Sequence, residues 1–174
     1  MIQRSRVLGV LGVCGLAAVP TTAKALEVNF GGSVGAIQVA TEPRLAVSPF
    51  VGLLWHTEGG LLLAVHNMFS ILPGDHIGLH DRTSAALGYT WPTGDVSLGP
   101  SLSFYWMLAC DPLACRRVEG AAPGVHTQVD WYFARFFGGS LSANVAWYGG
   151  SSAILPDNSA VMVTGGLIVR LETK

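Results

Sequence analysis

The segment Ser140–Tyr148, with the sequence SLSANVAWY, alternates large apolar side chains with small or polar ones. Successive side chains of a β-strand point to opposite faces, so Leu141, Val145 and Trp147 share one face. The opposite face carries Ser140, Ser142, Asn144 and Tyr148. The pattern predicts a strand between two different surroundings, and the nature of those surroundings decides the fold class.

Seven other segments have the same low charge, and most of them alternate in the same way. In Val96–Met107, one face carries large apolar side chains such as Leu98 and Trp106, and the other carries serine, glycine and Tyr105. No helical periodicity competes with this pattern. The eight predicted strands are Glu27–Val39, Leu45–Trp55, Leu61–Met68, Thr83–Trp91, Val96–Met107, Val125–Phe133, Ser140–Tyr148 and Ala160–Leu171.

The composition of the smaller face indicates which solvent surrounds the strands. In a water-soluble barrel, the face opposite the apolar core is rich in Lys and Glu. Here that face carries Ser, Gly, Thr, Asn and Ala, and Asp130 is the only charge within the eight segments away from their ends. Small neutral side chains fit the narrow interior of an eight-stranded barrel, and bulky apolar side chains fit lipid. We therefore predict an all-β fold, an eight-stranded antiparallel up-and-down transmembrane β-barrel.

The N-terminus has the features of an export signal. Two arginines precede the apolar stretch at residues 7–19, which is too short for a membrane helix, and the Ala-Lys-Ala at residues 23–25 resembles a cleavage site. We expect residues 1–25 to be a signal peptide and residues 26–174 to form one barrel domain. All 11 acidic residues follow the predicted site, whereas three of the 10 basic residues precede it. The resulting net charge of −4 argues against a nucleic-acid partner.

The predicted connections and the tryptophan positions also favour a membrane crossing. After the first turn, every second connection is long, as in outer-membrane barrels with short periplasmic turns and longer external loops. The long loops Phe69–Arg82 and Leu108–Gly124 are the expected contact elements, because binding residues are often carried by loops. Tryptophans near strand ends are typical of the two membrane interfaces. The predicted aromatic girdle comprises Trp55, Trp91, Trp106, Trp131 and Trp147.

As a pattern over residues 26–174, these strands, loops and aromatic positions resemble small eight-stranded outer-membrane barrels of the OmpA/OmpX architecture. The resemblance implies a location in the outer membrane of a Gram-negative bacterium and contact with outer-membrane lipid and lipopolysaccharide. It also implies a monomer and no cofactor. One feature departs from the pattern: such proteins usually end on an aromatic residue, whereas this sequence ends Leu-Glu-Thr-Lys.

Three charged residues are predicted to form a cluster in the lumen near the periplasmic end. Glu27 opens the first strand and Arg170 closes the last, and these strands are neighbours in a closed barrel. Burying a charge without a partner is unfavourable, so we predict that Arg170 pairs with Glu27 and, across the lumen, with Asp130. The alternative is that Glu27 and Arg170 are solvated at the rim.

Four histidines are expected towards the external end. His66 and His126 are predicted to face the lumen, and His76 and His80 to lie in the loop Phe69–Arg82. Imidazoles bind zinc and copper, but this spacing matches no recognised motif, and a metal site needs a fixed geometry. We therefore predict no metal site and treat the four histidines as weak candidates.

Two cysteines follow the predicted signal peptide, at Cys110 and Cys115. In an exported chain, two cysteines this close together predict a disulfide, which would rigidify the longest external loop.

The expected function is a structural or surface-interaction role through the external loops. A first alternative is an outer-membrane enzyme that modifies lipid A, with His126 as a base for Ser101 or Ser103. Nothing in the sequence fixes that pairing, so no catalytic residue is assigned. A second alternative is a soluble secreted β-barrel that holds a small ligand.

Overall fold

The computed structural model describes residues 23–39, 42–74, 77–110, 115–147 and 159–172. The first 22 residues of the predicted signal peptide lie outside the described residues, and Ala23 opens the first strand. In the described ranges, no helix is long and apolar enough to cross a membrane.

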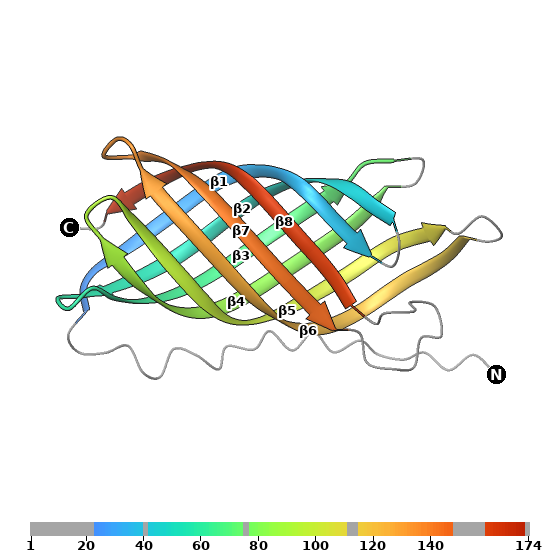
Figure 1. Cartoon of the computed structure of the whole chain (residues 1–174), viewed down its shortest axis with the longest axis horizontal. Helices are drawn as coiled ribbons and strands as arrows, with labels where there is room; N and C mark the ends of the chain where they lie inside the picture. Colours follow the sequence, from blue (N-terminus) through green and yellow to red (C-terminus); the bar gives the residue numbers. More distant parts are fainter. Residues whose placement is uncertain (1–22, 40–41, 75–76, 111–114, 148–158, 173–174) are drawn as a thin grey trace.

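Eight strands form one closed barrel, in which each strand pairs antiparallel with the next and the last pairs with the first (Figure 1). The predicted all-β, eight-stranded, up-and-down barrel is confirmed. At the seam, the pairing of the first and last strands continues from Glu27 opposite Glu172 to Val39 opposite Ala160. The strands are β1 (Ala23–Val39), β2 (Glu42–Thr57), β3 (Leu61–Leu72), β4 (Gly78–Trp91), β5 (Gly94–Cys110), β6 (Cys115–Tyr132), β7 (Phe137–Trp147) and β8 (Ser159–Glu172).

The barrel directs large apolar side chains outward and small polar side chains inward. In β7, Leu141 and Trp147 are each 49% exposed, whereas Ser140, Ser142 and Asn144 are buried. Buried polar side chains come from all eight strands. This arrangement is the inverse of a water-soluble barrel, whose buried face is apolar.

Three tight connections gather at one end of the barrel, which we call the short-turn end. They span residues 58–60, 92–93 and 133–136, and β1 begins and β8 ends beside them (Figure 1). In the first, Gly60 has a φ of 80°, a left-handed conformation that glycine adopts without a steric penalty. Its amide donates to the carbonyl of Thr57 at 3.1 Å, which closes the turn. We call the opposite end the long-hairpin end.

The hairpins at the long-hairpin end contain more strand than the sequence predicted. The predicted loop Phe69–Arg82 is mostly strand, because β3 ends at Leu72 and β4 begins at Gly78. The predicted loop Leu108–Gly124 is likewise mostly strand, in β5 and β6. The prediction ended each strand near its first charged residues, but ladder hydrogen bonds join main-chain groups and do not require apolar side chains.

Apolar side chains fill part of the lumen. Ile37, Met68 and Met162 are buried in one cluster together with Phe50. The Phe50 ring lies close to Gly31, where an added Cβ would come within 2.7 Å of the ring. The absence of a side chain at Gly31 therefore leaves room for the Phe50 ring. The interior is packed as closely as the core of a soluble protein.

Candidate functional site

Two separate groups of polar and ionisable side chains lie inside the barrel. The short-turn group consists of Glu27, His56, Thr90, Asp95, Asp130 and Arg170. The Arg82 group consists of His66, His80, Arg82, Ser84 and His126. Both groups include a residue of β4, and Arg82 and Thr90 are eight residues apart, roughly 27 Å along an extended strand.

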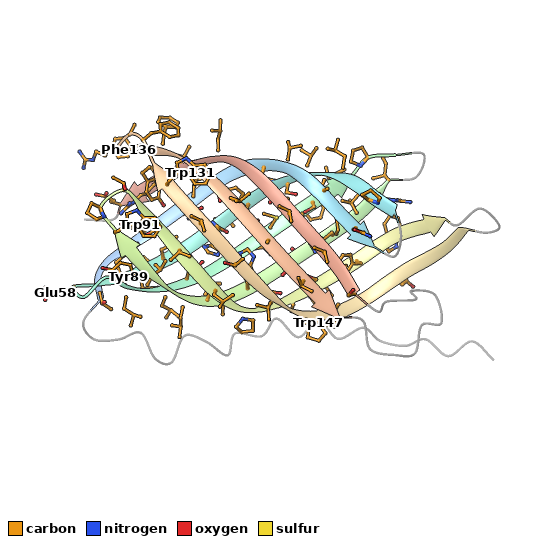
Figure 2. All side chains as sticks on the ribbon, in the orientation of Figure 1. Glu58, Tyr89, Trp91, Trp131, Phe136 and Trp147 are labelled. Atoms are coloured by element: carbon orange, nitrogen blue, oxygen red, sulfur yellow. The ribbon has the colours of Figure 1, made fainter. Side chains whose placement is uncertain are left out.

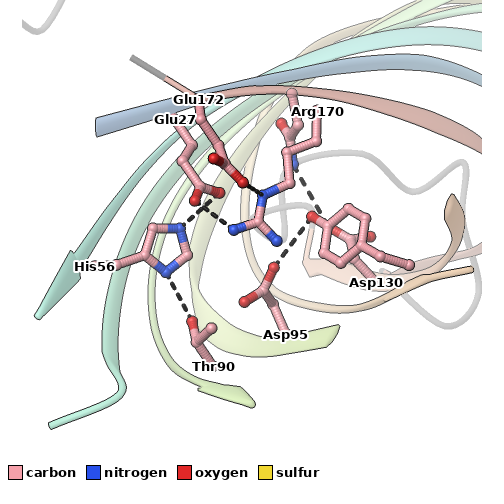
Figure 3. Close-up of polar contacts among 9 residues, drawn as sticks. Glu27, His56, Thr90, Asp95, Asp130, Arg170 and Glu172 are labelled. Atoms are coloured by element: carbon pink, nitrogen blue, oxygen red, sulfur yellow. Dashed lines mark hydrogen bonds and ion pairs between the residues drawn. The ribbon is translucent and has the colours of Figure 1, made fainter. Parts of the chain in front are cut away.

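Glu27 is the centre of the short-turn group (Figure 3). One oxygen of its carboxylate accepts a hydrogen bond from the Arg170 guanidinium, and the other lies 2.9 Å from Nε2 of His56. Nδ1 of His56 lies 2.8 Å from the hydroxyl of Thr90. The structure thus brings Glu27 and Arg170 together across the β1–β8 seam. Glu27 is only 4% exposed, so it is not the solvated rim carboxylate of the alternative prediction.

Asp130 is held by amides, which differs from the predicted pairing with Arg170. Its two carboxylate oxygens accept hydrogen bonds from the side-chain amide of Gln128 at 3.0 and 2.9 Å. The Asn29 amide, from β1, reaches Asp130 at 3.5 Å across the lumen. Asp130 is buried near the short-turn end, where the prediction placed it. Its hydrogen-bond donors are neutral amides and not the predicted cation.

Tyr132 connects Arg170 to a second carboxylate. The Arg170 guanidinium lies 4.6 Å from the centre of the Tyr132 ring, within range of a cation–π interaction. The Tyr132 hydroxyl donates to Asp95 at 3.1 Å. Arg170 therefore contacts the buried carboxylate of Glu27 directly and that of Asp95 through an aromatic side chain, and the exposed carboxylate of Glu172 lies 3.9 Å away.

The series Thr90, His56 and Glu27 joins a hydroxyl, an imidazole and a carboxylate, which is the connectivity of a nucleophilic triad. In a triad the carboxylate serves to orient the imidazole, whereas here it also binds Arg170. The four side chains come from β1, β2, β4 and β8. This geometry ties four strands together at the short-turn end. We therefore interpret these four side chains, Glu27, His56, Thr90 and Arg170, as a structural clamp.

The structure agrees with the predicted positions of two of these histidines and differs for a third. His66 and His126 face the lumen as expected, with exposed fractions of 2% and 0%, and their rings meet edge to face at 5.8 Å. The prediction for His80 was wrong: it belongs to β4, is fully buried, and stacks on Tyr105 at 4.5 Å. His76 lies outside the described residues. Within the described ranges, no three metal-ligating side chains are grouped to hold an ion.

Arg82 is the residue that sequence reasoning missed. It is 1% exposed, and none of its three guanidinium nitrogens has a hydrogen-bond partner among the described residues. The prediction placed Arg82 at the end of a loop, because the strand was expected to begin at Thr83. The period-two order of His80, Arg82 and Ser84 was the available signal, since it continues the inward face of β4.

The proposed base–nucleophile pairs of the enzyme alternative take other partners. Ser101 donates to Oδ1 of Asn144 at 2.7 Å, and Nδ2 of Asn144 donates to Ser103 at 3.4 Å. Nδ1 of His126 donates to the main-chain carbonyl of Ala143 at 3.2 Å. Asn144, rather than a histidine, therefore organises the two serine hydroxyls.

The predicted girdle residues lie near both ends of the strands. Figure 2 shows Trp91 and Trp131 around the short-turn end and Trp147 at the other end of β7. Trp106, Trp131 and Trp147 are each 45–49% exposed, and Trp55 and Trp91 are half-buried. The Trp131 ring covers Gly139, where a Cβ would meet it at 2.3 Å. Large aromatic rings thus lie against the outer surface of neighbouring strands.

Cys110 and Cys115 are opposite each other at the ends of β5 and β6. Directly opposed residues of an antiparallel pair have Cα atoms about 4.5–5.5 Å apart, which is within the range of a disulfide. Their side chains and residues 111–114 lie outside the described part of the chain, so the disulfide stays a prediction.

The barrel has the fold of several solved outer-membrane proteins. Neisserial surface protein A matches with a TM-score of 0.53 and 14% identity, over 83% of this chain and 96% of that one. The N-terminal barrel domain of Pseudomonas aeruginosa OprF matches with a TM-score of 0.56 and 10% identity, over 86% and 98%. Ail of Yersinia pestis, solved with the heparin analogue sucrose octasulfate, matches with a TM-score of 0.51 and 7% identity, over 84% and 98%.

These likenesses show that the chain has the fold of small eight-stranded outer-membrane barrels, as the resemblance in sequence pattern implied. No protein-family model matches the sequence, and no curated protein is similar to it. The shared fold therefore rests on the pattern of strands and not on a common motif.

Proposed function

We propose that the protein is an outer-membrane β-barrel that crosses the bilayer with its eight strands. The observation that carries this proposal is the outer surface: Leu87, Leu98 and Leu167 are 59–68% exposed, and large apolar side chains project from every strand. A continuous apolar surface is unfavourable in water and suits lipid. A closed barrel also leaves no strand edge unpaired, which the hydrocarbon core of a membrane requires.

The filled interior supports a structural or surface-contact role for this barrel over conduction. Eight-stranded barrels are just wide enough for their side chains to fill. By the usual orientation of such barrels, the short-turn end faces the periplasm and the long-hairpin end faces outside. Contacts with other molecules are then made by the hairpins at the long-hairpin end.

The β5–β6 hairpin is the best candidate for that contact element. Pairing of β4 with β5 stops at Trp106, and pairing of β6 with β7 stops at Gly124, but β5 and β6 stay paired to Cys110 and Cys115. The end of this hairpin therefore projects beyond its neighbours (Figure 1). We propose that a Cys110–Cys115 disulfide holds its tip.

Membrane fractionation is the experiment that tests the location. The protein, expressed with its N-terminal segment, is expected in the outer-membrane fraction, to stay there through an alkaline wash, and to be released by detergent. Unboiled and boiled samples are expected to migrate differently on a gel, because the folded barrel resists detergent. Recovery in the soluble fraction would overturn the proposal and favour the soluble ligand-binding alternative.

Cysteine labelling of intact cells tests the orientation. Gly74→Cys places a thiol on the exposed β3–β4 connection, and Glu58→Cys places one on the exposed β2–β3 turn as the matched control. A membrane-impermeant maleimide is expected to label position 74 in intact cells and position 58 only after permeabilisation. The unsubstituted protein measures background labelling, and the reverse pattern would show the opposite orientation.

A further inference from the structure

Arg82 is a buried cation for which the described part of the chain supplies no counter-charge. Its side chain is buried on the inward face of β4, and Nε, Nη1 and Nη2 have no hydrogen-bond partner among the described residues. Moving a guanidinium out of water without an anionic partner is strongly unfavourable. The folded barrel is therefore either destabilised by this desolvation or stabilised by a partner of Arg82 that is not a side chain.

The nearby carboxylates do not serve as that partner. Asp81 is the neighbour of Arg82 in sequence, but it faces the opposite side of the strand and accepts a hydrogen bond from Asn67 at 2.9 Å. Asp95 lies opposite Thr90 in the sheet, roughly 27 Å along β4 from Arg82. The other two inward-facing carboxylates of the short-turn group are bound elsewhere, since Asp130 accepts from Gln128 and Asn29 and Glu27 accepts from Arg170.

Other polar side chains without a hydrogen-bond partner within the described ranges lie near Arg82 on the inward faces of β3 and β4. Ser84 lies two residues from Arg82 on the same face of β4, and His66 is opposite Ser84 on β3. Both side chains are 2% exposed, and neither the Ser84 hydroxyl nor either ring nitrogen of His66 has a partner among the described side chains and main-chain groups. His66 lies within electrostatic range of Arg82.

A chain of hydroxyl groups orients a third donor. Ser48 donates to Ser70 at 2.8 Å, and the Ser70 hydroxyl lies 3.4 Å from Nδ1 of His80. Because Ser70 accepts from Ser48, its own proton points to Nδ1 of His80, and the neutral ring then carries its hydrogen on Nε2. This Nε2 is buried and has no partner in the described structure, and His80 also lies within electrostatic range of Arg82.

His126 has a different role in the same group. Its Nδ1 faces the carbonyl of Ala143 and must donate, so the Nε2 of the neutral ring is an acceptor. Its ring packs edge to face against His66. His126 therefore positions His66 and does not itself donate a hydrogen bond towards Arg82.

We propose that Arg82, His66, His80 and Ser84 form a binding site for a small inorganic anion of halide size inside the barrel. One full positive charge and three neutral donors match a single monovalent anion, and donors of these types bind anions in protein interiors. The tight burial of all four side chains selects a small ion over a phosphate ester or a carboxylic acid. The anion then acts as the missing counter-ion and stabilises the folded barrel.

Replacement of chloride tests this site in the full protein, purified from membranes in detergent. Thermal unfolding is followed in sodium chloride and in sodium gluconate of equal ionic strength, because gluconate is too large for the site. We expect the wild-type melting temperature to rise by about 3 °C or more in chloride, since a ligand of the folded state raises stability. Crystals grown with bromide are expected to show an anomalous peak beside the Arg82 guanidinium.

Two variants separate this site from general salt effects. Arg82→Met removes the charge from the lumen and is expected to abolish the difference between chloride and gluconate. Arg135→Gln removes an exposed arginine, which lies over the Phe136 ring at the β6–β7 turn, and is expected to keep the difference. Should Arg82→Met fail to fold, Ser84→Ala takes its place and is expected to reduce the difference.

The site is overturned by any one of three results. These are equal wild-type melting temperatures in the two salts, a chloride effect that persists in the Arg82 variant, and a bromide peak that is absent from the lumen. The last result, with ordered density of water only, would mean that solvent alone surrounds the guanidinium.

Discussion

The two polar groups in the lumen differ in how their charges are satisfied. In the short-turn group, Glu27 binds both Arg170 and His56, and Asp130 accepts three hydrogen bonds from amides. In the Arg82 group, the cation has no hydrogen-bond partner among the described residues. A group whose cation is paired with a buried carboxylate stabilises the barrel directly, whereas a group whose cation lacks such a pair is suited to bind an anion.

One residue lies between the two groups. Gly52 on β2 is opposite Asn29 on β1 and His66 on β3. A Cβ at this position would come within 2.1 Å of Oδ1 of Asn29 and 2.5 Å of the His66 ring. Asn29 belongs to the network of Asp130, and His66 belongs to the Arg82 group, so the absence of a side chain lets both groups occupy the same narrow lumen.

Arg170→Ala is expected to have the largest effect on stability. The substitution leaves Glu27 buried without its cation, which lowers the free energy of unfolding by about 3 kcal/mol. Urea unfolding followed by gel mobility measures this change. Glu172→Gln is the control, because Glu172 is 41% exposed and 3.9 Å from Arg170, and exposed ion pairs contribute little. Equal effects of the two variants would show that the clamp does not depend on the buried pair.

Gly52→Ala is expected to follow, with a loss of about 2 kcal/mol, because the added methyl group must displace Asn29 or His66 in a filled interior. The same unfolding measurement applies. Gly32→Ala on β1 is the matched control, since an added Cβ there meets nothing within 4 Å. If both glycine variants were equally stable, the side chains of Asn29 and His66 would be packed less closely around Gly52 than the structure indicates.

Thr90→Val is expected to lower the free energy of unfolding by about 1 kcal/mol, because it removes one hydrogen-bond partner of His56 at constant volume. Thr83→Val is the comparison, as its hydroxyl accepts an exposed hydrogen bond from Asn67. We expect a smaller loss there. A larger loss at position 83 would argue against a clamp that includes Thr90.

Arg82→Met is expected to lower the free energy of unfolding least, and in the absence of chloride it is expected to leave this free energy unchanged or raise it. In gluconate the variant is expected to be as stable as the wild type or more stable, because an apolar side chain of similar length replaces an unpaired buried charge. Unfolding in gluconate measures this directly. A loss as large as that of Arg170→Ala would mean that Arg82 is already satisfied within the protein, and the contrast between the two groups would disappear.

Sequence reasoning predicted the strands of this barrel better than its polar interior. The alternation in Ser140–Tyr148 was sufficient to assign inner and outer faces, because the period of a strand does not depend on its neighbours. The level of Asp130 also followed from its position in a strand. His80 and Arg82 were misplaced, because a polar sequence at the end of a hairpin looks the same whether it is a solvated loop or a strand that faces a lumen.

The sequence by itself determined that this chain forms eight strands with one apolar and one small polar face, since both properties are local. Closure of the barrel decided which charges meet. Only the pairing of β8 with β1 brings Arg170 to Glu27, which are 143 residues apart. Likewise, only the curvature of β3, β4 and β6 around one axis gathers His66, Arg82 and His126, because contacts across a lumen depend on register and closure, which no short segment contains.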